Sequence, residues 1–285
     1  MSKGSAALRK KKKIIAYLSV LTALGLLLIP GLYNGLCIQK YRIEDERINN
    51  TVRIAHISDL HSCKYGKQEE KLIDAIDSQE PDVILMSGDM FDERTDDENT
   101  EYFLQGIYDK YPCYYVTGNH EFYCGSEIFA DEMAMLEQYN VTILSGETEI
   151  ITLNGETINI CGVDDPCSYM VDGTINLDKQ LKSTSQQADN RNYTILLSHR
   201  PEMFEKYTDY NFDLVLCGHA HGGQWRIPGI LNGLYAPDQG IFPKYAGGLY
   251  QSEEMTMIVS RGLAREIPLV PRIYNRPELC IIDLK

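Results

Sequence analysis

The sequence predicts an α/β fold in its first half and a mixed arrangement of strands and helices in its second half. Between residues 52 and 138, short apolar strand-like runs alternate with segments whose apolar residues recur at helical spacing. From residue 141, β-rich runs follow one another closely. Polar motifs come directly after several of these runs. Because open α/β sheets bind ligands at the carboxyl ends of their strands, we expect a functional site there.

The first half contains three predicted strands and three predicted helices. The strands are the apolar runs at 52–58, 83–86 and 113–116. The helices, each with an apolar stripe on one face, cover 69–78, 100–108 and 128–138. This alternation indicates a parallel sheet with helical crossovers.

The second half is richer in strands and has no internal repeat. Strands are predicted at 141–144, 149–153 and 157–163, with Asn154-Gly155 as a hairpin turn between the last two. Residues 171–192 are polar and indicate an insertion with one surface helix. Buried strands follow at 193–197 and 214–216. The Gly- and Pro-rich stretch 226–285 has short predicted strands at 255–259 and 279–283.

The amino-terminal segment has the pattern of a membrane anchor. Residues 1–13 carry six bases and no acid, and no charged residue occurs from Ile14 to Gln39. Residues 14–38 are long enough for a hydrocarbon core, which needs roughly 20 residues. A cleaved signal peptide is disfavoured because an A-x-A-like cleavage site is missing, and a lipoprotein because Leu36 is a poor neighbour for lipidation at Cys37. A buried helix is disfavoured by the length of the uncharged stretch. An uncleaved signal anchor is therefore favoured.

This pattern also predicts the topology and the domain boundaries. The excess of bases before the span places residues 1–13 in the cytoplasm as a basic tail. We therefore expect a single-pass cell-membrane protein whose catalytic domain is extracytoplasmic. A polar linker is predicted at 39–51, and the catalytic domain at 52–285.

Charge and cysteine spacing exclude two classes of function. Without the basic tail, 21 bases face 41 acids, a net charge of −20, so no nucleic-acid partner is expected. The eight cysteines form no CxxC pair, which removes support for a thiolate zinc site. Cys161 and Cys167 are close enough in sequence to be a disulfide candidate, and the redox compartment stays open.

Five polar motifs at the predicted strand ends carry the chemistry. They contain five of the six histidines, and they are Asp59-Leu60-His61, Gly88-Asp89, Gly118-Asn119-His120-Glu121, Ser198-His199 and Gly218-His219-Ala220-His221. Each motif alone is weak evidence, because an acid after a strand is more often a cap or a turn. The two imidazoles of Gly-His-x-His are more specific, since side chains two apart on an extended segment point the same way.

This donor set predicts a pair of divalent cations. Imidazole, carboxylate and amide without thiolate suit Mn, Fe or Zn. Seven such side chains are too many for one ion but fit two ions about 3.5–4 Å apart, bridged by a carboxylate and a hydroxide. Two such ions neutralise phosphate oxygens, hold the ester and lower the pKa of a bridging water.

The order of these motifs, from about residue 52 to 224, resembles the calcineurin-like metallophosphoesterases. The resemblance implies a four-layer αββα sandwich of two mixed β-sheets flanked by helices. It implies that Asp59, His61 and His221 hold the first metal, that Asn119, His199 and His219 hold the second, and that Asp89 bridges both. It also implies that His120 contacts the phosphate and protonates the leaving oxygen.

Several other residues have a possible functional role and an alternative structural one. In relatives an acid at the position of Asp92 can orient the catalytic histidine, and the alternative is a solvated loop acid or a helix cap. Glu121 is a candidate for supporting the ligands. His56 is expected to be a packed strand histidine. Lys244, Arg261 and Arg265 are either anion contacts or partners of nearby acids.

The carboxyl-terminal motifs indicate a particular branch of this family and, with it, a class of substrates. Leu234-Tyr235-Ala236-Pro237-Asp238-Gln239-Gly240 and Asn275-Arg276-Pro277-Glu278 resemble the membrane-anchored bacterial branch, which is similar to UDP-2,3-diacylglucosamine pyrophosphatases. We therefore expect hydrolysis of a phosphodiester, pyrophosphate or phosphomonoester. The substrate would be a phosphorylated small molecule, a lipid-linked compound or a nucleotide-sugar. The rival reading is a non-catalytic metal-binding envelope scaffold on the same fold.

Overall fold

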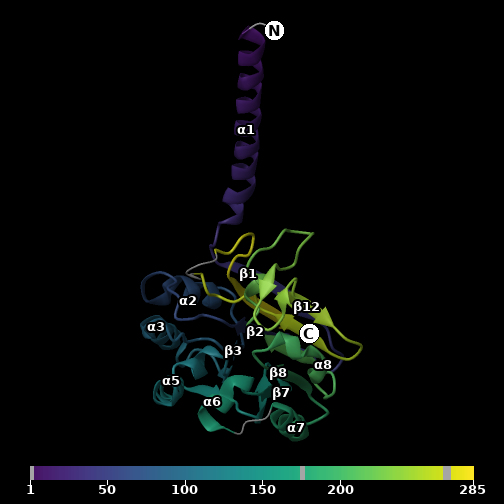
Figure 1. The fold of residues 1–285 in the computed structure, drawn as a ribbon. Coiled ribbons are helices and arrows are strands. Elements are labelled where there is room, and N and C mark those ends of the chain that lie inside the picture. The colour runs from purple at the N-terminus through teal and green to yellow at the C-terminus, as the bar shows by residue number, and fades with distance from the viewer. Residues whose placement is uncertain (1–2, 174–176, 266–270) are drawn as a thin grey trace.

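Two six-stranded mixed sheets form the centre of the molecule (Figure 1). The computed structural model describes residues 3–173, 177–265 and 271–285. The first sheet has the order β1-β14-β2-β3-β4-β5, and the second has the order β12-β13-β9-β8-β7-β6. Strands β10 (Tyr235–Ala236) and β11 (Gly240–Ile241) form a separate two-stranded ribbon.

The first sheet takes its strands from both ends of the chain. Strands β2 to β5 run parallel, β14 is antiparallel to β2, and β1 is parallel to β14. The bounds are β1 Cys37–Ile43, β2 Val52–Ile57, β3 Val83–Ser87, β4 Cys113–Val116, β5 Val141–Ile143 and β14 Glu278–Leu284.

The second sheet is parallel at its centre and antiparallel at both edges. Strands β7, β8, β9 and β13 run parallel, with β6 and β12 antiparallel at the two edges. The bounds are β6 Thr148–Leu153, β7 Glu156–Gly162, β8 Tyr193–Leu197, β9 Leu214–Cys217, β12 Gly248–Gln251 and β13 Thr256–Val259. The turn between β6 and β7 is at Asn154 and Gly155, both at positive φ, as the hairpin prediction requires.

Helices cover the outer faces of the sheets. Those beside the first sheet are α2 (Glu70–Asp77), α3 (Glu98–Ile107) and α5 (Ser126–Gln138). Those beside the second are α7 (Leu177–Gln187) and α8 (Phe204–Tyr207). The remaining short elements are α4 His120–Tyr123, α6 Tyr169–Asp172, η1 Lys67–Glu69, η2 Pro166–Ser168, η3 Pro201–Met203 and η4 His221–Gly223.

Three apolar clusters hold four layers together, in the order helices, first sheet, second sheet, helices. In β2, Val52 and Ile54 belong to the cluster between the sheets, while Ala55 and Ile57 belong to the cluster shared with α2, α3 and α5. This alternation follows from the two-residue period of a strand. A third cluster lies between the second sheet and α7 and α8. Each large apolar side chain buried in this way contributes roughly 1.5–3 kcal/mol. The predicted sandwich of two mixed sheets is confirmed.

The amino-terminal region differs from the predicted boundaries. Helix α1 covers Lys3–Gly31 and projects away from the sandwich (Figure 1). Among the described residues, no helix combines the length and the apolar character that crossing a membrane requires. Part of the predicted span and part of the predicted 39–51 linker form β1 instead. Tyr41 and Ile43 pack against the cluster between the sheets, and that burial orders a segment that looks polar in sequence.

All eight cysteines are free thiols. Cys161 is fully buried in β7, and Cys167 lies in η2, so the disulfide candidate is not formed.

Candidate metal centre

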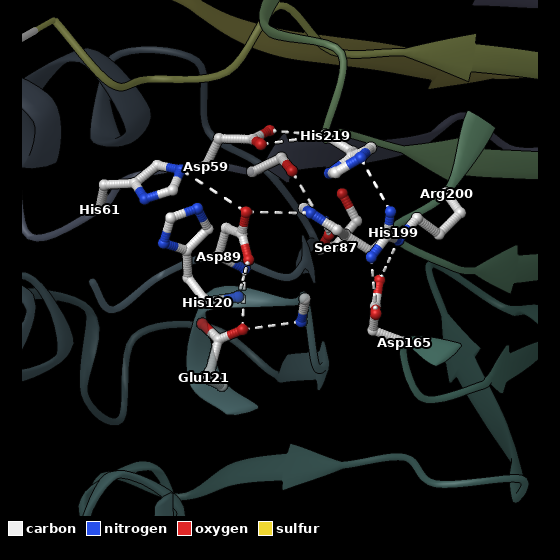
Figure 2. A network of polar contacts seen from close by, with 12 residues as sticks. Asp59, His61, Ser87, Asp89, His120, Glu121, Asp165, His199, Arg200 and His219 are labelled. Carbon is white, nitrogen blue, oxygen red and sulfur yellow. Dashed lines mark hydrogen bonds and ion pairs between the residues drawn. The ribbon is translucent and has the colours of Figure 1, made fainter. Parts of the chain in front are cut away.

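The predicted ligands gather where strand ends of the two sheets meet. Asp59 and His61 follow β2, Asp89 follows β3, and Asn119 follows β4. From the second sheet, His199 follows β8, and His219 and His221 follow β9. All seven side chains belong to buried residues. Residues far apart in sequence thus converge at one seam between the sheets (Figure 2).

The backbone at these positions is unusual. Asp59, His61, Asp89, His219 and His221 all have φ between 46° and 63°. The left-handed region is sparsely populated by residues with a Cβ atom, and such strain clusters at functional sites. A Cβ atom on Gly118 would lie 2.2 Å from Oδ1 of Asp89, so only glycine fits there. The Gly of this motif therefore serves close packing.

One group of four side chains forms the first candidate cation position. A ligand atom from each of Asp59, His61, Asp89 and His221 lies within 4.8 Å of the others. Nδ1 of His61 lies 2.9 Å from Oδ2 of Asp92, which directs Nε2 toward Asp89 at 3.6 Å. A carboxylate on the far nitrogen of a ligand histidine fixes its tautomer and its orientation.

A second group shares Asp89 with the first. Asp89, His199 and His219 offer ligand atoms within 4.8 Å of one another. Nδ1 of His199 donates to the carbonyl oxygen of Ser87 at 2.7 Å, so Nε2 carries the free lone pair, 3.0 Å from Oδ2 of Asp89. Asn119 is adjacent, since the backbone N–H of His120 donates to Oδ1 of Asp89 at 2.9 Å.

The residues present fit two divalent cations. Four buried polar atoms at this seam are left without a regular hydrogen bond: His61 Nε2 and Asn119 Oδ1, and the ion-paired atoms His199 Nε2 and Asp89 Oδ2, which lie 3.0 Å apart. A buried polar atom without a partner costs about 1–3 kcal/mol, so four together require an explanation. Each belongs to a predicted ligand, and a cation would satisfy it. The donor set of imidazole, carboxylate and amide suits Mn, Fe or Zn.

Electrostatics within the group also leave a place for positive charge. Burial raises the pKa of the Asp89 carboxyl, but the facing charge of His199 outweighs it and holds that pKa well below its usual value. Burial disfavours charged His199, yet Asp89 raises the pKa of His199 to about 10. Burial, with the charge of His61, lowers the pKa of His221 well below its usual value. Protons thus take the role of the counter-charge that cations would supply.

His120 is at the edge of this group, and its acid partner is not the predicted one. Its Nδ1 lies 2.6 Å from Oε2 of Glu93 but 3.7 Å from Oδ2 of Asp92. Asp92 instead contacts the ligand His61. Glu93, which sequence reasoning missed, makes the shorter contact with His120, while Asp92 stays within ion-pair distance of it. Glu93 carries no signal of its own, because it is one acid in the acid-rich stretch 92–98.

Glu121 organises two of the ligand loops. Its buried carboxylate accepts hydrogen bonds from four backbone N–H groups, those of Asp89, Met90, Phe91 and Gly118, at 2.7 to 3.2 Å. These donors belong to the loops after β3 and β4. The supporting role considered for Glu121 is thus exerted on backbone, and it fixes the separation of Asp89 and Asn119.

A buried arginine supports the other side of the centre. Arg200 is ion-paired with Asp165 and Asp238, and its Nη1 lies 3.0 Å from Nε2 of His219 (Figure 2). Nε2 of His219 is also 2.9 Å from Oδ2 of Asp238. When Nε2 donates to that carboxylate, the lone pair of a neutral ring lies on Nδ1, which is free for a cation. Sequence reasoning missed Arg200 and Asp165.

The remaining candidates have simpler roles. His56 is fully buried in β2, with Nε2 2.8 Å from Oγ of Ser87, and burial lowers its pKa to about 3. It is a packed strand histidine, as expected. Lys244 pairs with Glu205, and Arg261 pairs with Glu278. Arg265 donates to the carbonyl oxygen of Lys64 and lies over the ring of Tyr65.

The sequence is similar to those of known proteins. The sequence matches the family described as calcineurin-like phosphoesterase over residues 52–223. An uncharacterized metallophosphoesterase of Aquifex aeolicus is 29% identical over 257 residues, covering 87% of this chain and 91% of that protein. The phosphodiesterase YaeI of Escherichia coli is 26% identical, covering 81% of this chain and 82% of its own.

A solved structure shares the fold. The 5'-nucleotidase precursor of Thermus thermophilus aligns with a TM-score of 0.51 and 15% identity, over 75% of this chain and 49% of that one.

Proposed function

The chain belongs to the calcineurin-like phosphoesterase family and is a hydrolase, and we propose that it cleaves phosphoesters or pyrophosphates with two divalent cations held by seven side chains. Asp59, His61 and His221 would hold one cation, Asn119, His199 and His219 the other, and Asp89 both. The observation that carries this proposal is the shared carboxylate. Asp89 belongs to both ligand groups, and its buried Oδ2 faces one imidazole of each, His61 at 3.6 Å and His199 at 3.0 Å.

The protein side chains have separate roles in this reaction. Cations bound here would neutralise phosphate oxygens and lower the pKa of a water, so that a nucleophile exists near neutral pH. Glu93 holds Nδ1 of His120 at 2.6 Å, which leaves Nε2 to contact the phosphate and to protonate the leaving oxygen. Glu121 and Arg200 hold the ligand loops in place from opposite sides.

The test separates an enzyme from a metal-binding scaffold on the same fold. Purified full-length chain is loaded with Mn²⁺ or Zn²⁺, its bound metal is counted by mass spectrometry, and its hydrolysis of bis(p-nitrophenyl) phosphate is measured. We expect two cations per chain and metal-dependent hydrolysis. Two bound cations without hydrolysis of this diester, of p-nitrophenyl phosphate or of a sugar pyrophosphate would favour the scaffold.

We further propose that the protein acts at the cell membrane, with its amino terminus in the cytoplasm and the catalytic domain outside. Supporting this are the uncharged stretch 14–39 and the six bases before it. An external domain cannot reach cytoplasmic nucleotide-sugars, so lipid headgroups and envelope polymers are the favoured substrates. A reporter fused after Lys285 tests the orientation, and a cytoplasmic signal would contradict it.

A further inference from the structure

A turn on the side of the molecule from which α1 leaves carries exposed apolar side chains. Ile227 and Leu231 pair across it, and the backbone N–H groups of Ile230 and Leu231 donate to the carbonyl oxygen of Ile227. Its apex is Pro228-Gly229-Ile230, and Ile230 is 84% exposed. Turn apices normally carry polar residues, so an isoleucine there calls for an explanation. We call Trp225, Ile227 and Ile230 the apolar tip.

The apolar tip is joined to the end of α1. Nε1 of Trp225 donates to the carbonyl oxygen of Pro271 at 2.9 Å, and Trp225 pairs with Ile273 as an isolated bridge. The next residue, Tyr274, donates its backbone N–H to the carbonyl oxygen of Gly31 at 2.7 Å. In Figure 1 the green loop of this region rises on the same side as the base of α1. Exposed Leu32 and Tyr33 extend the surface to the helix.

We propose that the apolar tip docks on a lipid bilayer. Large apolar residues exposed next to one another, rather than singly, mark an interaction surface. The exposed side of α1 continues this surface, because Ile15, Leu18, Leu26 and Ile29 are all more than half exposed. A bilayer is the occupant that covers a helix and a neighbouring turn together. Tryptophan, with an apolar ring and a satisfied N–H, is enriched at the membrane–water interface.

Charge favours the same occupant. The domain is strongly acidic, yet residues 222–236 and 271–277 contain no Asp or Glu. Below the turn lies a hollow of about 440 Å³ lined by Arg226, Arg261 and Tyr274 together with the turn itself. Arg261 is ion-paired with Glu278, whereas Arg226 donates hydrogen bonds to Asn232 and to the carbonyl oxygen of Gly222. The guanidinium of Arg226 beside an apolar apex suits the phosphate layer of a membrane surface, where each nearby base contributes about 1 kcal/mol with anionic lipids.

Docking would place the metal centre at headgroup level. Nδ2 of Asn275 donates to the carbonyl oxygen of His221 at 2.7 Å, so the segment that contacts α1 also contacts a predicted ligand. Arg272, in the same segment, lies 3.4 Å from Nδ1 of His221. The consequence, a lipid-linked phosphoester as substrate, rests on the proposed function, whereas the docking surface does not.

The chain offers a direct probe, because Trp225 is its single tryptophan. Full-length protein is reconstituted into vesicles of phosphatidylcholine and phosphatidylglycerol whose acyl chains are either brominated or unmodified. Bromine quenches tryptophan only on contact, so we expect a loss of Trp225 emission in brominated vesicles. Ile230→Glu should abolish this loss. Ile128→Glu, a matched change at an exposed isoleucine of α5, should retain it.

Several outcomes overturn the proposal. They are wild-type protein that fails to float with the vesicles, equal emission in both vesicle types, and unchanged quenching in Ile230→Glu. Emission shielded from aqueous iodide but not quenched by bromine would mean that a second protein chain covers the tip. Hydrolysis of bis(p-nitrophenyl) phosphate in detergent is measured in parallel. If neither the wild type nor the variants hydrolysed this diester, the proposed phosphoesterase activity would be refuted, and the docking proposal would be unaffected.

Discussion

The two candidate cation positions share Asp89 but are supported differently. At the first position, Nδ1 of His61 contacts the carboxylate of Asp92, and Nδ1 of His221 lies 3.4 Å from Arg272. At the second, Nδ1 of His199 donates to a backbone carbonyl, and Nε2 of His219 donates to Asp238, which is ion-paired with Arg200. A backbone carbonyl and an ion pair of buried Arg200 support the second position, whereas Asp92 and the segment with Arg272 and Asn275 support the first. The comparison indicates that each position can be weakened separately.

Replacing the shared carboxylate should weaken both cation positions at once. Asp89→Asn removes a charge from both positions, so we expect activity on bis(p-nitrophenyl) phosphate to fall below detection and at least one cation to be lost. Metal counting and the assay check this on the same preparation. Full activity in this variant would end the dinuclear assignment.

Replacing His120 should remove activity but spare both positions. His120 is proposed to donate a proton rather than to hold a cation, and general acid catalysis contributes about 10²–10⁴-fold. We expect His120→Ala to lose activity in that range and to keep two cations per chain. Glu93→Gln should lower kcat in the same direction with less effect on KM, because Glu93 acts through His120. Loss of a cation from either variant would contradict these roles.

Replacing a carboxylate that supports a ligand histidine should weaken one cation position and not the other. Loss of a carboxylate behind a ligand histidine typically costs 10–100-fold in metal affinity. We expect Asp92→Asn to weaken one of two binding events in a Mn²⁺ titration. Asp238→Asn should weaken the other event, since an amide holds the proton on Nε2 of His219 less firmly than the carboxylate does. Equal weakening of both events in either variant would contradict separate support.

A buried acid away from both positions should affect stability alone. Burial, then the charge of Glu121, raises the pKa of Glu132 to about 9. The folded state therefore binds a proton more readily than the unfolded state, and its stability is lost as pH rises from about 4.5 toward 9. We expect Glu132→Gln to lose less stability over that range, by on the order of 5 kcal/mol, since each unit of pKa shift corresponds to about 1.4 kcal/mol. Urea unfolding at pH 5, 7 and 9 tests this, with exposed Glu127→Gln as control.

Local patterns in the sequence predicted the alternation of strands and helices and the convergence of the ligands, whereas the sandwich of two sheets was implied by the family resemblance. Runs such as 83–86 are apolar without interruption, and a polar motif after each run must lie at a strand end. Edge strand β1 escaped prediction, because its alternate residues are exposed and its partner β14 lies at the far end of the chain.

The residues that support the ligands could not be predicted from the sequence for a related reason. Glu93 and Arg200 act through contacts that span 27 and 19 residues, respectively, and no spacing rule indicates them. Asp92 was assigned to His120 by resemblance, whereas its distance to His61 is shorter. Which acid contacts which imidazole depends on side-chain geometry within one loop, and that geometry is decided by packing.

The pairing of β14 with β2 has a consequence for how the protein is made. Arg53 and Asp283 form an ion pair across these strands although 230 residues separate them. A ribosome must therefore release almost the whole polypeptide before this inner strand of the first sheet can take its place, and contacts so distant in sequence form slowly. The first sheet therefore stays open on the β2 side until β14 has been synthesised, and its apolar faces remain exposed for longer than those of a sheet built from neighbouring segments.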